Sequence, residues 1–363
     1  MINRSFWKKR RVFLTGHTGF KGAWATLLLR ALGAEVHGFA LTPEHSADLF
    51  AVAGIADDVH HELGDIRNGQ ALRDAVTRAR PDVVIHMAAQ SLVRRSYEEP
   101  AETYSTNVMG TVNLLEAVRH APSVQAVVVV TTDKCYRNNG WVWGYRENDT
   151  LGGHDPYSNS KACAELVTEA YRNSFFHTTG ASRIGSARAG NVIGGGDWAR
   201  DRIVPDAVRA FTTGQKLRIR HPRATRPWQH VFDPLAGYLI MCERLAGGDN
   251  GFAEAWNFGP SAASEVPVAT LIDGFTRRWG GNAQWERDVG DHPHEAAYLK
   301  LDCAKATTRL GWRPSLELDA ALDLTADWYR AFHDGADMRA FSLKQIDEFL
   351  TAHVPAVAQK IEA

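Results

Sequence analysis

The sequence is poor in cysteine, carries almost no net charge and contains no long apolar run, and each shortage excludes a class of protein. Its 363 residues include four widely spaced cysteines that form no Cys-x-x-Cys pair, namely Cys135, Cys163, Cys242 and Cys303. We therefore expect reduced thiols in a cytoplasmic protein. The formal net charge of −1 gives no case for binding nucleic acid or an anionic membrane.

Membrane and leader segments are also missing from the pattern. No stretch approaches the roughly 18 apolar residues that a membrane helix requires. The basic run Lys8–Arg11 leads directly into an apolar strand-like segment, which argues against a signal peptide. Hydrophobic residues nevertheless make up 44% of the chain, enough for a large α/β unit and a smaller second unit.

The first half of the chain alternates strand-like and helix-like segments. Short apolar, β-branched runs between amphipathic helices predict a doubly wound α/β fold, in which a buried parallel sheet carries helices on both faces. Strands are expected at 12–15, 35–41, 83–88 and 127–132, with another ending at Leu63-Gly64, and helices are expected near 21–32, 68–79, 101–119 and 157–176.

A glycine-rich loop joins the first expected strand to the first expected helix. Glycines permit a tight turn and a close approach of the backbone to a pyrophosphate, and the helix N-terminus adds partial positive charge. The alternative is an ordinary strand–helix turn, which this setting disfavours. We expect a dinucleotide to be bound by Gly16, Thr18, Gly19, Phe20, Lys21 and Gly22.

Other strand ends offer further contacts to a dinucleotide. The acid that usually holds the adenosine ribose is missing, because Phe39–Pro43 follow the second strand, and no arginine stands there for a 2′-phosphate. Asp65-Ile66 could accept from an adenine amino group, although Asp65 could equally cap the next helix. The predicted set is completed by Ala88, Ala89, Gln90, a buried polar Asn107 within a helix, and Thr131.

Tyr157 and Lys161 lie four residues apart and so share one face of the expected helix. A free phenol has a pKa near 10, and a nearby ammonium together with a cationic nicotinamide would lower it. Tyr157 could then take a proton from a hydroxyl while a hydride leaves the same carbon, and Lys161 could also hold the ribose. This spacing alone is common on helix surfaces, where the alternative is an ordinary surface pair. The glycine loop upstream favours the catalytic interpretation.

Thr132-Asp133-Lys134 end the strand that precedes this helix. Ligands of open α/β sheets sit at that edge, so the Thr132 hydroxyl could relay the proton. An acid and a base beside it, Asp133 and Lys134, exceed what simple alcohol oxidation needs. The alternative is a turn with solvated charges.

From about residue 190 the pattern loosens into a loop-rich region with several prolines. We expect 1–190 to form the dinucleotide-binding domain and 191–363 mainly a smaller substrate-binding domain, with a return to the first near 228–260. Arg202, Arg218 and Arg226 could hold a diphosphate, or could be solvated surface residues. His292, His294 and Glu295 lack further spaced ligands, so no metal is expected.

Five longer runs resemble the extended short-chain dehydrogenase/reductase family, in its nucleotide-sugar branch, and the likeness spans about residues 7 to 315. Within that branch, Thr132-Asp133-Lys134 is similar to the sequence of the 4,6-dehydratases that act on CDP-glucose, whereas the dTDP-glucose enzymes carry Thr-Asp-Glu and the 4-epimerases usually lack this pair. The runs are Thr15–Gly22, Trp141–Asn148, Asp155–Lys161, Gly190–Trp198 and Arg226–Val231.

The resemblance implies a Rossmann-type fold and a bound NAD that is regenerated in each turnover. It implies loss of water from CDP-glucose, giving a 4-keto-6-deoxy sugar for surface polysaccharide such as lipopolysaccharide O-antigen. Asp133 would protonate the departing 6-hydroxyl and Lys134 would assist at C5. A homodimer through 101–119 and 157–176 is also implied, as are the substrate contacts Asn191, Trp198 and His230.

Two other functions remain open at this point. The chain could be a 4-epimerase, or a 4,6-dehydratase for another nucleotide sugar. It could also be a non-catalytic regulator that senses a dinucleotide, although the intact set Thr132, Tyr157 and Lys161 argues against that.

Overall fold

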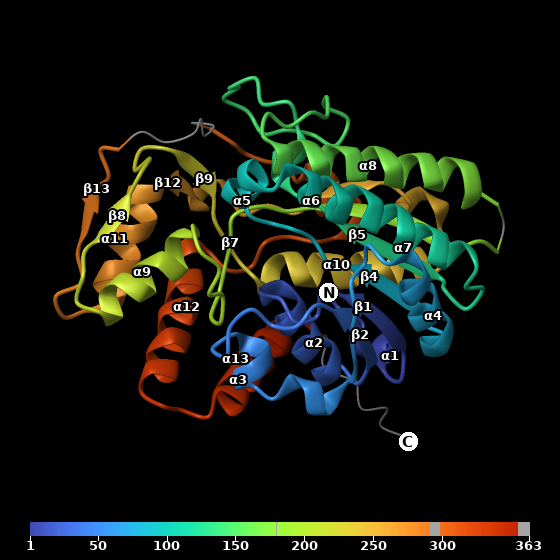
Figure 1. The fold of residues 1–363 in the computed structure, drawn as a ribbon, viewed down its shortest axis with the longest axis horizontal. Coiled ribbons are helices and arrows are strands. Elements are labelled where there is room, and N and C mark those ends of the chain that lie inside the picture. The colour runs from blue at the N-terminus through green and yellow to red at the C-terminus, as the bar shows by residue number, and fades with distance from the viewer. Residues whose placement is uncertain (179, 291–297, 355–363) are drawn as a thin grey trace, which may run out of the picture.

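A seven-stranded parallel sheet forms the centre of the computed structural model, which describes residues 1–178, 180–290 and 298–354 (Figure 1). The strand order is β11-β6-β5-β4-β1-β2-β3, and each neighbouring pair runs parallel. Six of these strands follow the 3-2-1-4-5-6 order of the Rossmann fold. The strands are β1 (Arg11–Thr15), β2 (Glu35–Ala40), β3 (His60–Leu63), β4 (Val83–His86), β5 (Ala126–Val130), β6 (Arg183–Arg188) and β11 (Ala255–Asn257).

Both faces of the sheet are buried, because alternate residues of each strand enter two separate cores. Val12 and Leu14 of β1 enter the core beneath α2 (Phe20–Ala31), α10 (Phe232–Ala246) and α13 (Met338–His353). Phe13, between them, enters the core of the opposite face. That face is covered by α4 (Gly69–Ala79), α7 (Gly110–Arg119) and α8 (Pro156–Phe175) (Figure 1).

The predicted elements of the first half are confirmed, with informative differences at their ends. The strands expected at 83–88 and 127–132 end at His86 and Val130, because the next residues form loops at the C-terminal ends of the strands. The helix expected over 101–119 is α6 (Pro100–Tyr104), the π-helical turn η2 (Ser105–Met109) and α7. π-helical turns of this kind often occur near functional sites.

A smaller lobe lies beside the C-terminal ends of the sheet's strands, on the left in Figure 1. It contains the helices α9 (Ile203–Thr212), α11 (Val268–Trp279) and α12 (Leu318–His333). Its short strands pair as β8 (Leu217–Ile219) with β13 (Trp285–Arg287), β9 (Thr225–Pro227) with β12 (Glu265–Pro267), and β7 (Val192–Ile193) with β10 (Gln229–His230).

The second half of the chain also returns to the first. β11 completes the sheet beside β6, and α13 packs against α2. The division at residue 190 therefore remains a prediction about folding units. The short helical segments are α1 (Arg4–Trp7), α3 (Leu49–Val52), α5 (Val93–Glu98), η1 (Ile55–Asp58), η3 (Asp133–Cys135), η4 (Asn250–Phe252), η5 (Ala262–Ser264) and η6 (Ala306–Leu310).

Two simple expectations from composition can be compared with the structure. All four cysteines carry free thiols. Among the helices that the structure describes, none combines the length and the apolar character needed to cross a bilayer.

Buried histidines give the fold a predictable response to acid. Burial lowers the pKa of His86 and of His230 to about 3, well below the ordinary value of 6.5. Below pH 6.5 these imidazoles are protonated in the unfolded chain but stay neutral in the folded chain, so the free energy of unfolding falls as the pH falls toward 3. Each such histidine should contribute a slope of about 1.4 kcal/mol per pH unit.

Urea unfolding between pH 7 and pH 4 measures that slope. The His230→Asn chain should show a shallower fall than the unchanged chain, by about the contribution of one histidine. The exposed His120→Asn should leave the slope as it was. An unchanged slope in His230→Asn would show that this imidazole is protonated within the fold.

Candidate active site

A cavity of about 1580 Å³ opens along the C-terminal edge of the sheet, between the sheet and the smaller lobe. Its walls come from the loops that follow the central strands and from residues of α5, α8, α9 and β8. Most of the predicted site residues line it, namely Gly16, Thr18, Gly19, Phe20, Lys21, Gly22, Asp65, Ile66, Ala88, Ala89, Gln90, Thr131, Thr132, Lys134, Tyr157, Lys161, Asn191, Trp198, Arg202, Arg218 and Arg226.

The glycine loop packs so closely on neighbouring backbone that side chains at two of its positions would clash. Gly16 has φ +75°, and a Cβ there would lie 2.7 Å from the backbone nitrogen of Ala88. A Cβ on Gly22 would lie 2.0 Å from the carbonyl oxygen of Gly16. Gly19 caps α2 without a side-chain hydrogen bond, so the helix N-terminus opens into the cavity. This cradle fits the pyrophosphate of a dinucleotide.

Asp65 faces the cavity at the end of β3 and is held by Arg67. It accepts hydrogen bonds from the Arg67 backbone nitrogen (2.8 Å) and from Nε (2.8 Å), and these bonds hold the pKa of the carboxyl below its usual value. The alternative reading of Asp65 as a helix cap is wrong. Asn68 caps α4 instead, by accepting from the backbone nitrogen of Ala71.

Asn107, which was predicted to bind the cofactor, is not among the residues that line the cavity. It sits in η2, where the helix turns its amide toward the loop after β4. Its Oδ1 accepts from the Gln90 backbone nitrogen (2.9 Å), while Nδ2 donates to the Gln90 carbonyl (2.9 Å) and to Ser160 Oγ (2.8 Å). The side chain therefore fixes the position of Gln90, which does line the cavity.

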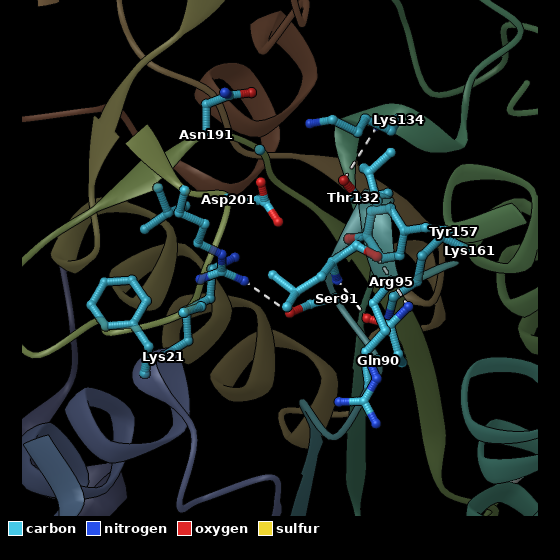
Figure 2. A pocket seen from close by; sticks show the side chains of 18 of the residues that line it. Lys21, Gln90, Ser91, Arg95, Thr132, Lys134, Tyr157, Lys161, Asn191 and Asp201 are labelled. Carbon is cyan, nitrogen blue, oxygen red and sulfur yellow. Dashed lines mark hydrogen bonds between the residues drawn. The ribbon is translucent and has the colours of Figure 1, made fainter. Parts of the chain in front are cut away.

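The start of α8 places Tyr157 at the cavity. Asp155 caps the helix by accepting from the Ser158 nitrogen (2.9 Å), and Pro156 occupies its first position. One turn later, Lys161 donates from Nζ to the carbonyl oxygen of Val130 (3.1 Å). Figure 2 shows Tyr157, Lys161 and Thr132 on one wall, with Lys21 across the cavity.

Burial dominates the ionisation of this wall. It raises the pKa of Tyr157 to about 12, although a hydrogen bond with Thr132 and the charge of Arg202 oppose the rise. Burial also lowers the pKa of Lys161 to about 8, against the opposing charge of Glu165. In the chain without a bound nicotinamide, desolvation of the phenolate outweighs the nearby positive charge, and the expected lowering of the Tyr157 pKa, which also depends on the cationic nicotinamide, stays a prediction.

Asp133 departs from the predicted arrangement, because it lies behind the wall instead of lining the cavity. The residue is fully buried, and its Oδ1 accepts from Thr132 Oγ1 (3.0 Å) and lies 3.6 Å from Lys134 Nζ. Its Oδ2 has no hydrogen-bond partner among the described residues. Gly190 leaves the space that it fills, since a Cβ there would lie 2.0 Å from the carboxyl group.

Arginines line the side of the cavity that the smaller lobe forms. Arg202 donates to Asp197 (2.8 Å) and to Ser91 Oγ (2.8 Å), so it bridges the lobe and the loop after β4. Arg218 is largely exposed beside Glu286 (3.2 Å). Arg226 is buried and donates to the Thr225 carbonyl (3.0 Å).

Lys21 adds a further cation to this cavity. Burial, together with the charge of Arg202, lowers the pKa of Lys21 to about 7. Asn191 also faces the cavity, in the left-handed backbone region at φ 47°, and Figure 2 shows it near Lys134. Trp198 lines the cavity and packs on Tyr329, with ring centroids 5.4 Å apart.

His230 does not reach the cavity, contrary to the prediction. It is fully buried on β10, which pairs with β7, and its ring packs edge-on against Phe232 at 4.5 Å. His292, His294 and Glu295, where no metal was expected, lie outside the described residues.

The sequence analysis did not predict a further group of charged side chains that line the cavity. Asp201 accepts from Arg94 (3.1 Å) of α5 and from Arg220 (2.9 Å) of the smaller lobe. The run Ser91–Arg95, with two arginines directly after the fourth strand, was the available signal.

Comparison with known proteins identifies the family. The model of the GDP-mannose 4,6 dehydratase family matches residues 13–325. The chain belongs to this family.

Named relatives agree with that assignment. A CDP-glucose 4,6-dehydratase of Salmonella typhimurium is 49% identical over 97% of this chain and 99% of that protein. A dTDP-glucose 4,6-dehydratase of Xanthomonas campestris pv. campestris is 28% identical over 87% of this chain and 92% of its own. Among solved structures, the dTDP-glucose 4,6-dehydratase DesIV from Streptomyces venezuelae, with NAD and TYD bound, has a TM-score of 0.75 and 27% identity, covering 90% of this chain and 98% of that one.

The glycine loop generates a test that separates ligand binding from folding. A Cβ on Gly19 would meet the Gly16 carbonyl oxygen at 3.5 Å, an ordinary contact, and would project where a pyrophosphate approaches. Gly19→Val should therefore lose NAD while keeping the melting temperature that the unchanged chain has without NAD. Gly22→Ala, whose Cβ has no room, should lower the melting temperature. Normal NAD content in folded Gly19→Val would move the pyrophosphate elsewhere.

Proposed function

We propose that this protein removes water from CDP-glucose to give CDP-4-dehydro-6-deoxyglucose. The observation that carries the proposal is the convergence of Thr132, Lys134, Tyr157 and Lys161 on one cavity that also contains the glycine cradle. The relative from Salmonella typhimurium, which is named for this reaction, supports the choice of substrate.

NAD is the cofactor that this cradle fits, and when bound it supplies reversible hydride transfer with the sugar. The Gly16–Gly22 loop and the N-terminus of α2 would hold its pyrophosphate. Asp65 would face the adenine, and Lys161 would reach the nicotinamide ribose. Because the hydride returns to the sugar, the reaction has no net redox change.

The chain's own residues can carry the proton transfers. Tyr157, in a hydrogen bond with Thr132, is positioned to take the proton of the 4-hydroxyl. Lys134 lines the cavity two residues further along and would assist proton removal at C5, which the new ketone acidifies. Asp133 would protonate the departing 6-hydroxyl after its buried carboxyl turns toward the cavity, a movement that substrate binding must drive.

Diphosphate binding falls to the arginines of the smaller lobe. Arg226 is the strongest candidate, because it is buried and lines the cavity. Arg202 would contribute charge while keeping its bond to Asp197. Both would form charge-assisted hydrogen bonds with phosphate oxygens.

The deciding experiment offers CDP-, dTDP-, GDP- and UDP-hexoses to the purified protein and measures product mass. Loss of one water from CDP-glucose is expected, whereas a 4-epimerase would leave the mass unchanged. Tyr157→Phe should lower turnover by about 10²-fold or more, because no phenolic oxygen remains near C4. Absence of turnover on every nucleotide sugar would favour a dinucleotide-sensing regulator.

A second experiment assigns Lys134 to elimination and not to the first oxidation. With C5-deuterated CDP-glucose, Lys134→Met should still show the absorbance of reduced nicotinamide in a single turnover. Exchange of the C5 deuteron with solvent and formation of dehydrated product should both fall. Lys344→Met, changed on the exposed face of α13, is the matched control. Loss of the nicotinamide signal would place Lys134 in the oxidation step.

We further propose a homodimer formed through the 101–119 and 157–176 segments. The support is a group of exposed apolar side chains on neighbouring elements, Tyr104 on α6, Met109 on η2 and Leu166 on α8. Tyr104 also donates to Asn159 of α8 (2.9 Å), which holds the two helices together. These helices form one side of the molecule in Figure 1.

Leu166→Asp tests the dimer, because it introduces a charge into the apolar group. Sedimentation should show a monomer for this variant and a dimer for the unchanged chain. Ala51→Asp, an exposed change on α3, should remain a dimer. A dimeric Leu166→Asp would place the interface elsewhere.

Location in the cytoplasm and a role in deoxysugar supply for lipopolysaccharide O-antigen complete the proposal, supported by the free thiols and the substrate class.

A further inference from the structure

A cluster of two histidines and one carboxylate lies far along the strands from the catalytic cavity. Glu35 is the first residue of β2, His37 follows two positions later, and His60 is the first residue of β3. The cavity is lined by residues that follow the other ends of these strands. The cluster is therefore separate from the site described above.

The sheet itself brings these three side chains together. Residues i and i+2 of a strand point to the same face, so Glu35 and His37 are neighbours on one face of β2. His37 and His60 are register partners across the β2–β3 pair, and their rings stack with centroids 4.2 Å apart and planes 14° apart. The paired strands therefore fix the backbone positions of the three residues, while ion binding would require one of the stacked rings to rotate.

The potential ligand atoms converge. Nε2 of His37 lies 3.0 Å from Glu35 Oε1, and Nε2 of His60 lies 3.2 Å from the same oxygen. One ligand atom from each of the three residues lies within 4.8 Å of the other two. Ligands at about 2.0–2.1 Å from a tetrahedral zinc ion stand about 3.3–3.4 Å apart. The two Nε2–Oε1 separations are close to that spacing, and rotation of an imidazole ring would bring the two ring nitrogens to a shared ion.

We propose that Glu35, His37 and His60 bind one divalent transition-metal ion, such as Zn²⁺. Two imidazole nitrogens and one carboxylate oxygen suit zinc, nickel or cobalt, and they do not suit the all-oxygen preference of calcium or magnesium. In the described residues, this is the single group of three such side chains with ligand atoms so close together. His60 is 66% exposed, which leaves an open side for a water ligand.

The competing account is a hydrogen-bonded set, in which both imidazoles donate to the Glu35 carboxylate. Arg11, the register partner of Glu35 on β1, adds a positive charge that any cation must tolerate. The two accounts differ in what they predict. A hydrogen-bonded set binds no ion, whereas the metal site binds one ion per chain.

The ion would stabilise the edge of the sheet. β3 is the last strand, and within the sheet β2 alone pairs with it. An ion shared by His60 and the two β2 residues would therefore cross-link the edge strand to its neighbour. Because the cluster lies at the opposite ends of these strands from the cavity, the cross-link would act on folding and not on the chemical step.

The test uses the full chain after treatment with a chelator. Titration calorimetry with ZnSO₄, and separately with NiSO₄, should give one ion per chain that is lost in His37→Ala/His60→Ala. Glu35→Gln should bind more weakly, because the carboxylate charge is gone. The melting temperature of the unchanged chain should rise with zinc, while that of the double variant should not.

Two controls keep the assignment specific. His120→Ala removes an exposed histidine elsewhere, and His292→Ala/His294→Ala removes another pair of histidines that are close in sequence. Both chains should keep the ion. A double variant His37→Ala/His60→Ala that still binds one zinc ion, or an unchanged chain that binds none, would overturn the proposal. Turnover of CDP-glucose should be the same with and without zinc, so the outcome is independent of the proposed function.

Discussion

The buried ion pair between Arg188 on β6 and Glu165 on α8 is the interaction on which the geometry of the cavity depends. Arg188 Nη2 donates to Glu165 Oε2 at 2.8 Å, and both side chains are almost fully buried. Ser186 donates to the same oxygen (2.6 Å), and Thr131 donates to Oε1. Burial alone would raise the pKa of Glu165, but Arg188 and these hydroxyls hold it below its ordinary value.

This pair fixes both parts of the candidate catalytic machinery relative to each other. Glu165 stands one turn beyond Lys161 on α8, so the pair sets the position of that helix against the sheet. Arg188 Nη1 also donates to the hydroxyl of Tyr136 (2.8 Å), which directly follows η3 with its Asp133 and Lys134. Removing one partner of such a buried pair typically costs about 3–5 kcal/mol, so the arrangement is held firmly.

The sequence predicted those features that depend on neighbours along the chain. Strand periodicity, the Gly16–Gly22 loop and the helix near 157–176 are local signals, and the structure has these elements within a few residues of their expected positions. Features that depend on distant contacts were missed. Asp133 turns away from the cavity because Gly190, from another strand end, leaves space behind the wall.

The same limit explains the other departures. Asn107 was placed against the cofactor, yet the π-helical turn directs its amide to Gln90. His230 was placed against the substrate, yet pairing of β10 with β7 buries it beside Phe232. Asn107 was correctly predicted to be polar and buried, while the direction of both side chains depends on the tertiary fold.

Activation of Tyr157 follows from the balance between burial and charge. In the chain alone, the pKa of about 12 keeps the phenol protonated at neutral pH, so the free enzyme holds no ready base. Thr132 and Arg202 lower that pKa, but they do not overcome desolvation. Oxidised nicotinamide, when bound, would supply the positive charge that the chain alone lacks. The base would therefore become competent only when the cofactor is present, and this coupling links proton removal to the moment when a hydride acceptor is in place.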